Sequence, residues 1–399
     1  MTTSTRIDED PTGESPAVDG PAILANAHRI APLLREHAAE VEAARRLTQP
    51  VVDALRGSGV FRMSMPRARG GPEVDLLAQL EILEVLSRAD ASAGWCAMIG
   101  SDSGFYSAFL DEAAGRELYP GLDAATAGWI LPAGKLEVSD GGGYRLSGRW
   151  SFGSGCTHAD VISAGALVTE GGIPRLDADG RPDYRVALVP ASQVQIHDTW
   201  FTTGLCGSGS NDYSIDGVAV PAEHTFGFLE GRRDETLYRW PGFIIANLIA
   251  VPLGVAADAL DTAMGILTKK VSMPDMVPAY TEARVQAAVA SAHAMVGSAR
   301  SYTYDTLGAL WTIIAAGDEP SFAVRAAVVG CAAHTITTCR DAVQLLVDTV
   351  GTAAVQRNCT LDRNLRDLIT IRQHLMGQVK FREWAGGLWF GQPTPLPTL

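Results

Sequence analysis

The sequence predicts an α+β protein, mostly α, with an N-terminal helical domain, a central β domain and a C-terminal four-helix bundle. Apolar residues recur every three or four positions over 21–124, which is the spacing of helices that bury one face. Short alternating runs separated by Gly, Pro and Asp fill 125–230, and helical spacing returns over 231–399. Residues 1–20 are acidic and contain Ser, Thr and Pro, so we expect a disordered tail there.

Four helices are expected in the first domain. Apolar spacing predicts one over 25–47 and a shorter one over 48–61. A third is expected to begin at Pro72, because proline and an acidic residue both favour a first helical turn. The fourth, over 91–110, is rich in small residues that allow another backbone or a ligand to come close.

A hairpin is expected at the start of the β domain. Two alternating runs lie on either side of the turn residues 140–143, whose sequence is DGGG. Further short strands follow, and together they give a β domain of roughly one hundred residues.

One helix of the C-terminal half carries a narrow stripe of small and apolar residues. Steps of four and three link Val324, Val328, Cys331, Thr335, Thr338, Ala342 and Leu345. Such a stripe suits tight packing between helices of a bundle. The helices of this half also carry more apolar surface than one bundle needs, so we expect contacts between subunits there.

Composition narrows the class of protein. The chain is 47% hydrophobic and 19% charged, with a formal net charge of −13. This is typical of a soluble globular protein and argues against nucleic acid or an anionic membrane as a partner. No uninterrupted apolar run approaches the roughly 20 residues of a membrane span, and no signal peptide is evident. The six scattered cysteines indicate reduced thiols, so we expect a cytoplasmic protein.

Several common motifs are missing from the sequence. No G-x-G-x-x-G follows a predicted strand, and there is no phosphate-binding P-loop. Clustered metal ligands are absent as well, so no metal site is predicted. An enzyme of redox type without a nicotinamide site would have to receive its electrons from elsewhere.

Three stretches together resemble one family. They are GRWSFGSGCTHAD at 148–160, TTGLCGSGSNDYSIDGVAVP at 202–221 and VGTAAVQRNCTLDRNLRDLITIRQH at 350–374. In this order and spacing they look like flavin-dependent monooxygenases of the acyl-CoA dehydrogenase fold, which are the oxygenase components of two-component hydroxylases. The resemblance covers nearly the whole chain after residue 20.

The resemblance implies a reaction. A separate NAD(P)H-flavin reductase would supply reduced flavin, FMNH2 or FADH2, and O2 would convert it to a C4a-hydroperoxide. This species would hydroxylate a small aromatic or heteroaromatic substrate, although the family also contains sulfur and nitrogen oxidisers. A homotetramer is implied, in which a neighbouring subunit helps to hold the flavin. An acyl-CoA dehydrogenase-like oxidoreductase and a non-catalytic helical scaffold remain as alternatives.

The resemblance places the flavin against five positions. Ser154 would lie beside the flavin N5 atom, with Phe152 and Gly153 against the ring. Pro132 lies in the segment WILPAGKLEV, which takes the place of a flavin motif of the dehydrogenases. Gly351 follows the small-residue stripe and would contact the flavin of a neighbouring subunit. The alternative for Phe152 is an ordinary core aromatic, and for Ser154 a turn residue.

His374 is the candidate catalytic base. It lies close to the position where the dehydrogenases carry a glutamate, and a histidine can deprotonate a phenol or hydrogen-bond the peroxide near neutral pH. The alternative is a polar residue near a helix end. Asp367 is seven residues away, about 10 Å along a helix, so we expect it to be structural and to pair with an arginine.

The predicted helix 91–110 would form a wall of the substrate pocket. Trp95, Ser101, Asp102 and Phe105 are its candidate lining residues, and burial in the core is an equal alternative for the two aromatics.

Cys206 and His158 also stand out in these stretches, but neither is assigned to the flavin or to the substrate. Cys206 stands where the family usually has an arginine, which leaves the contact of that arginine open. His158 is interpreted as structural, since it has no partners for a metal site.

Overall fold

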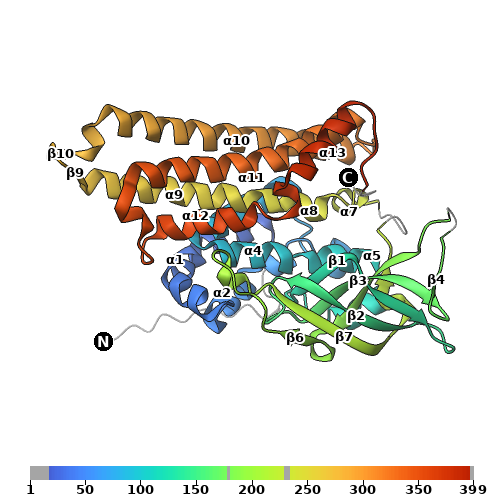
Figure 1. Ribbon diagram of the computed structural model, residues 1–399. Coiled ribbons are helices and arrows are strands. Elements are labelled where there is room, and N and C mark those ends of the chain that lie inside the picture. The colour runs from blue at the N-terminus through green and yellow to red at the C-terminus, as the bar shows by residue number, and fades with distance from the viewer. Residues whose placement is uncertain (1–17, 178–179, 229–233, 396–399) are drawn as a thin grey trace, which may run out of the picture.

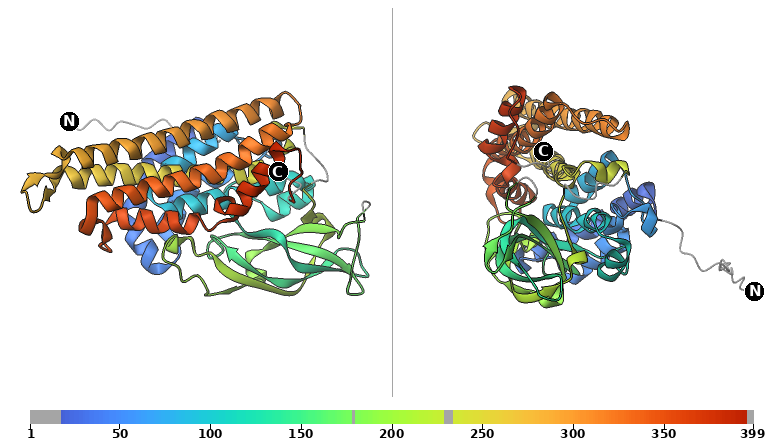
Figure 2. Two further views of the ribbon diagram at one scale, coloured as in Figure 1. Left: turned by 45° about the horizontal axis from the view of Figure 1, so that its top comes forward. Right: turned by 90° about the vertical axis from the view of Figure 1, so that its right-hand side faces the viewer.

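The computed structural model describes residues 18–177, 180–228 and 234–395. The C-terminal bundle lies across the N-terminal helices and the β domain, which stand side by side beneath it (Figure 1, Figure 2). The order of helices, strands and helices confirms the predicted architecture. The predicted tail lies outside the described residues as far as position 17, and Gly20 already belongs to the first helix.

In the described part of the chain, the N-terminal domain contains the α-helices α1 (Gly20–Ala44), α2 (Gln49–Ser58), α3 (Leu76–Ala89), α4 (Ala91–Gly100), α5 (Asp102–Phe109) and α6 (Glu112–Leu118). Helix α3 begins four residues later than predicted, because Glu73 has a φ of 47°, which no helix start allows. Asp75 caps it instead, accepting a hydrogen bond from the Ala78 amide at 3.0 Å. The predicted helix 91–110 is two helices that meet at Ser101.

The β domain is one sheet with the strand order β6-β7-β2-β1-β3-β5-β8, and β4 pairs with β3. Its strands are β1 (Thr126–Val138), β2 (Tyr144–Gly153), β3 (Val161–Glu170), β4 (Ile173–Pro174), β5 (Tyr184–Pro190), β6 (Gln195–His197), β7 (Asn211–Val220) and β8 (Thr225–Phe226). β1 and β2 form the predicted hairpin, with Lys135 opposite Ser147. Trp150 is fully buried and stacks on Tyr213 with ring centroids 5.4 Å apart.

A wide irregularity in β1 shapes the side of the sheet that faces the bundle. Trp129 pairs with Ala164 of the parallel strand β3 and Gly134 pairs with Ala166, so five steps of one strand match two of the other. Residues 130–133 have no partner in this register and form a bulge whose backbone packs against Gly165 of β3. The bulge needs glycine at position 165, where a Cβ would lie 2.1 Å from the Ile130 carbonyl oxygen.

The C-terminal part comprises α7 (Thr236–Arg239), α8 (Phe243–Ala246), α9 (Ala250–Lys269), α10 (Ala283–Ala315), α11 (Phe322–Val350), α12 (Thr360–Ile371) and α13 (Val379–Trp389), with a small hairpin of β9 (Val271–Ser272) and β10 (Val277–Pro278). The small-residue stripe of α11 packs within the chain. Thr335 exchanges a 2.9 Å hydrogen bond with Thr303 of α10, and Cys331 donates to the same Thr303. The stripe therefore brings α10 and α11 together, and its buried part is not a surface for another subunit.

Two segments of the described chain are long and apolar enough to cross a membrane by length and composition, Phe243–Lys269 and Phe322–Val355. Neither segment is an uninterrupted apolar run, but a high average hydropathy tolerates a few charged residues. Of their most apolar windows, 83% and 50% are buried inside the fold. This burial is what core helices of a bundle show.

Candidate active site

A cavity of about 420 Å³ lies between the bulge of β1 and the short helix η9 (Leu375–Gly377). Its lining is mainly apolar: Trp129, Ile130, Leu131, Pro132, Tyr184, Phe228, Ile244, Ile245, Leu375, Met376 and Phe381 contribute, together with His374. Charged lining residues come from the loop around Asp177, Arg181 and Asp183. The fold thus brings two predicted site residues, Pro132 and His374, to one cavity.

His374 is a neutral histidine in this cavity. It caps η9, where its Nδ1 accepts a 3.4 Å hydrogen bond from the Met376 amide. With Nδ1 as acceptor, the proton of the neutral ring belongs on Nε2. Burial lowers the pKa of His374 to about 4. The side chain is therefore an N–H donor at neutral pH. It is a weaker base than the sequence suggested, since a base that works near neutral pH was expected.

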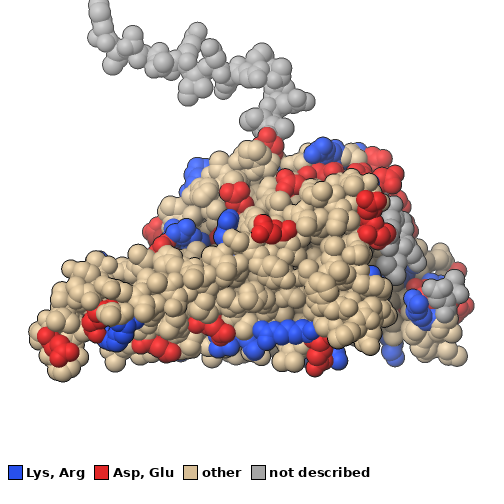
Figure 3. All heavy atoms as spheres, turned by 90° about the horizontal axis from the view of Figure 1, so that it is seen from above, with Lys and Arg blue, Asp and Glu red and all other residues tan. Residues whose placement is uncertain are grey.

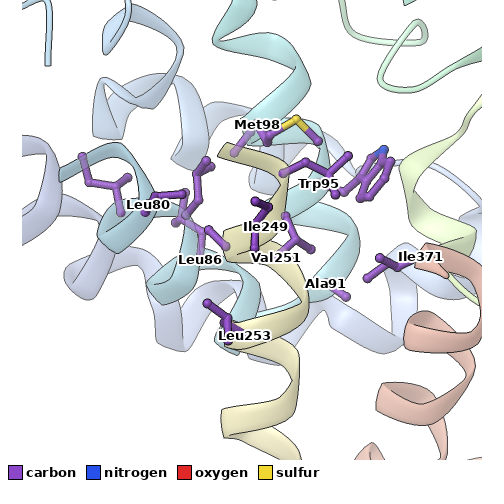
Figure 4. Close-up of a cluster of buried hydrophobic side chains, with 14 of the residues drawn as sticks. Leu80, Leu86, Ala91, Trp95, Met98, Ile249, Val251, Leu253 and Ile371 are labelled. Carbon is purple, nitrogen blue, oxygen red and sulfur yellow. The ribbon is translucent and has the colours of Figure 1, made fainter. Parts of the chain in front are cut away.

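Trp95 connects His374 with Ser154. Its ring meets the imidazole edge to face, with centroids 5.8 Å apart and planes at 74°. Its indole Nε1 donates a 2.9 Å hydrogen bond to Ser154 Oγ, which also contacts Ser210 Oγ at 2.7 Å. Figure 4 shows Trp95 beside a cluster of buried apolar side chains that includes Ile249 and Ile371. Tight packing and one hydrogen bond therefore fix the indole between His374, the predicted base, and Ser154, the predicted contact of flavin N5.

Phe152 lies on the surface of the sheet, unlike Trp150. Its side chain is 56% exposed and its ring centroid lies 5.9 Å from that of Trp129. The interpretation of Phe152 as a core aromatic is therefore wrong. Its φ of 64° is uncommon for a side chain of this size and turns the chain where β2 ends. The next residue must be glycine, because a Cβ on Gly153 would lie 2.9 Å from the Tyr213 ring.

None of the four substrate residues predicted on the segment 91–110 lines the cavity. Ser101 donates to the Met98 carbonyl at 2.7 Å, and Phe105 packs against Phe109 and Tyr238. Asp102 is buried beside them, and burial raises its pKa well above the usual value. The break at Ser101 directs α5 into the core, so only Trp95 of the four approaches the cavity through its contact with His374.

Gly351 lies far from the cavity of its own chain. A Cβ built on it would be 3.7 Å from Lys270 Nζ, and Lys270 leads into the β9–β10 hairpin at one end of the bundle. Helix α13, whose Phe381 lines the cavity, lies at the other end (Figure 1). Any contact of Gly351 with flavin would therefore belong to another subunit.

The loop that carries Cys206 is held by α12. Asp367 accepts a 2.6 Å hydrogen bond from the Leu205 amide, and the expected pairing of Asp367 with an arginine is not found among its described contacts. The adjacent Arg366 instead pairs with Glu42 and Asp362 and donates to the Thr203 carbonyl at 2.5 Å. Burial raises the pKa of Asp367 to about 7. Cys206 Sγ donates to the Thr202 carbonyl at 3.1 Å, a contact within its own loop.

His158 is half-buried, and its ring centroid lies 6.5 Å from that of Phe61. Burial lowers its pKa to about 4, and a Cβ on Gly155 would lie 3.2 Å from its ring. Among the described residues no group of three or more His, Cys, Asp or Glu side chains could hold a metal ion. A structural role for His158 agrees with this environment.

The β1 wall of the cavity, with the residues beside it, suits a flavin ring. A planar, largely apolar tricycle needs flat apolar walls and a few polar contacts at its edge. The side chains of Trp129 and Pro132 offer such a wall, and the bulged backbone of β1 beside them offers polar groups. Ser154 and His374 supply the polar side chains nearby. Sequence reasoning missed Ser208 and Ser210, whose hydroxyls extend from Ser154, although the G-S-G-S spacing was visible.

Comparisons with known proteins agree with this geometry. Family models for the acyl-CoA dehydrogenase N-terminal and C-terminal domains match residues 26–119 and 246–379. The chain is 31% identical to the indole-3-acetate monooxygenase of Pseudomonas putida, over 91% of this chain and 92% of that protein. It is 35% identical to the oxygenase component of the FADH2-dependent resorcinol hydroxylase of Rhizobium sp., over 60% of this chain and 58% of that protein.

The chain belongs to the flavin-dependent monooxygenases of the acyl-CoA dehydrogenase fold. The solved structure of XiaF from Streptomyces sp. in complex with FADH2 and glycerol has the same fold, with a TM-score of 0.87, 23% identity and coverage of 95% of this chain and 98% of that one. The monooxygenase is an oxygenase component, which uses reduced flavin and O2 and works with a separate flavin reductase. This assignment favours neither the dehydrogenase nor the scaffold alternative.

Proposed function

We propose that this monooxygenase hydroxylates a small aromatic or heteroaromatic compound in the cavity between β1 and η9. The observation that carries the proposal is the cavity itself, about 420 Å³ with mainly apolar walls and His374 among them. Apolar walls of this kind bind a flat, uncharged ring well, and a few polar groups orient it. The charged loop around Asp183 lies at the edge and suits a polar substituent.

The flavin would lie against the surface of β1 and β2. Reduced flavin, when bound, supplies the electrons that activate O2. Phe152, Gly153 and Pro132 would contact the ring system, and Ser154 would hold its N5 edge. The exposed ring of Phe152 and its left-handed backbone support this, since strained residues gather at ligand sites. The apolar cover from α8 and α13 would keep water from the reacting atoms.

His374 would act as a hydrogen-bond donor to substrate or to activated oxygen. A histidine whose pKa is about 4 takes a proton from a phenol poorly, because effective general bases have a pKa near the working pH. The Nε2–H of the neutral ring, by contrast, is available at every pH above about 5. The second role considered from the sequence, a hydrogen bond to the oxygen, is therefore the one we propose.

A homotetramer is the proposed assembly. Large apolar side chains are exposed on the bundle, among them Met264 of α9, Tyr302 of α10 and Phe322 of α11. Figure 3 shows wide uncharged stretches between scattered charges on the face seen from above. Surfaces of this kind mark protein contacts. Sedimentation should show four chains, and a monomer with full affinity for reduced flavin would contradict the proposal.

We also propose a cytoplasmic location, because the cysteines are free thiols scattered over the chain.

An anaerobic titration tests the proposed function. Reduced FMN and reduced FAD are each added to the protein without oxygen, and the complex is then mixed with O2 while the absorbance spectrum is recorded. We expect tight binding of one reduced flavin, oxygen consumption, and hydroxylated product once an indole or phenol is added. Reduction of bound oxidised flavin by an acyl thioester would support the dehydrogenase alternative instead.

A further inference from the structure

Three buried serine hydroxyls form a continuous line behind the end of β2. Ser154 Oγ lies 2.7 Å from Ser210 Oγ, which lies 2.7 Å from Ser208 Oγ. The line begins at the indole Nε1 of Trp95, 2.9 Å from Ser154 Oγ, and ends at the carbonyl oxygen of Leu205, 2.7 Å from Ser208 Oγ. All three serines are at most 5% exposed.

The two ends of the line fix the direction of every hydrogen bond in it. A hydroxyl has one hydrogen to donate, a carbonyl oxygen only accepts and an indole N–H only donates. Ser208 gives its hydrogen to Leu205, so it must accept from Ser210. Ser210 has then used its hydrogen and must accept from Ser154. The hydrogen of Ser154 is therefore committed to Ser210, and the indole of Trp95 donates into Ser154 from the other side.

The carbonyl that ends the line is held firmly in place. Leu205 adopts a left-handed φ of 48°, and its amide donates to Asp367. Its carbonyl oxygen also accepts from the Ser208 amide at 3.0 Å and from the indole of Trp200 at 2.9 Å. The peptide is bonded on both sides, so it cannot turn to reverse the line.

We propose that this line makes Ser154 an acceptor toward its ligand and so selects the reduced state of the flavin. The inference rests on the proposed function, which places flavin N5 beside Ser154. Reduced flavin carries a hydrogen on N5, whereas N5 of oxidised flavin has only a lone pair. An oxygen with no hydrogen to give bonds the first and repels the second. Ser208 and Ser210 are then positioning residues that set the redox preference without touching the flavin.

The test compares the dissociation constants of reduced and oxidised flavin in wild type and in Ser210→Ala. The substitution removes the acceptor, so the Ser154 hydroxyl can turn and donate to oxidised N5. We expect the ratio of the oxidised to the reduced Kd to fall about 2- to 10-fold, the effect of one hydrogen bond. The midpoint potential of bound flavin should fall in step, by about 30 mV for a tenfold change of this two-electron couple.

Two further variants complete the test. Ser208→Ala breaks the same line one link away and should lower the ratio in the same direction, which serves also if Ser210→Ala folds poorly. Ser107→Ala is the matched control, because Ser107 is fully buried and donates to the Gly104 carbonyl at 2.9 Å. It should leave the ratio unchanged.

The outcomes separate the inference from the proposed function. If wild type prefers reduced flavin and both line variants keep that preference in full, the inference is wrong and the proposed function stands. Equal binding of the two redox states by wild type also overturns the inference alone. If wild type binds neither state, the proposed function fails and the inference falls with it.

Discussion

Ser154 and His374 lie on either side of Trp95, yet their surroundings differ in kind. Ser154 takes part in two short hydrogen bonds within a line whose ends are fixed. His374 has one hydrogen bond of 3.4 Å and faces an apolar cavity. The Ser154 hydroxyl is therefore oriented before any ligand arrives, while the Nε2–H of His374 has no hydrogen-bond partner among the described residues. A preorganised group suits a cofactor that is always the same molecule, and a spare donor suits a varied substrate.

Removing the histidine should give the largest effect. His374→Ala takes away a donor beside the reacting atoms, and the loss of such a donor typically costs about 10²–10³-fold in rate. We expect product formation to fall by that factor, while reduced flavin still binds and oxygen is released as hydrogen peroxide. Oxygen consumption and product measured side by side give the coupling.

Two variants serve as controls for that experiment. His374→Gln keeps an N–H donor and should retain more product than His374→Ala. His334→Ala removes an exposed histidine of α11, whose ring lies 5.7 Å from that of Tyr302, and should behave as wild type. Full coupling in His374→Ala would make His374 an ordinary cap of η9.

The loop that leads to Ser208 and Ser210 packs against α12, and a substitution at Gly204 should disturb this contact. A Cβ on Gly204 would lie 2.0 Å from the Arg366 carbonyl oxygen. Gly204→Ala must push the loop away from α12, and overpacking of this kind costs about 1–3 kcal/mol in the free energy of unfolding. Thermal unfolding should show a lower Tm. Gly386→Ala is the control, since nothing lies within 4 Å of its Cβ position, and a Tm drop as large in that variant would contradict the packing argument.

Ser154→Ala should have a smaller effect. One lost hydrogen bond is worth about 0.5–1.5 kcal/mol, so the affinity for reduced flavin should fall by about 2- to 13-fold with the fold intact. Stopped-flow spectra would report the affinity and the lifetime of the oxygenated flavin together. If both match wild type, Ser154 is not beside N5.

The smallest expected effect is an absence of pH dependence from the histidine. The folded pKa of His374 is about 4, so the ring stays neutral and the hydroxylation step should not titrate with His374 between about pH 6 and 8. The free energy of unfolding should also depend on pH. In the unfolded chain His374 takes up a proton below its usual pKa near 6.5, whereas in the folded chain it does so only near pH 4. The folded state therefore loses stability as the pH drops from about 6.5 towards 4. A rate that rises through pH 6.5 in wild type and not in His374→Ala would show that ligand binding restores a basic histidine.

Sequence reasoning reached the architecture because its signals are local. The turn 140–143 gave the β1–β2 hairpin, and helical spacing gave the bundle. It failed where tertiary contacts decide. Asp367 pairs with the Leu205 amide, 162 positions away, and the positive φ of Glu73 moved a helix start.

The site was predicted in part for the same reason. His374 and Pro132 were found from motifs and do meet at the cavity. Ser101, Asp102 and Phe105 were expected on one helix wall, but the break at Ser101 turns them into the core. The serine line escaped notice because it joins Ser154 to Ser210 across 56 positions, and a serine in a glycine-rich loop has no pattern of its own.

The bulge of β1 has a consequence for how such an enzyme changes its substrate. Residues 130–132 line the cavity, and the pairing of β1 with β3 resumes at Gly134 beyond them. We therefore expect mutations of these three side chains to alter the wall of the binding site while the register of the sheet is kept. The segment is therefore a natural place for directed evolution to begin, since new specificity can be sampled there while the rest of the scaffold keeps its stability.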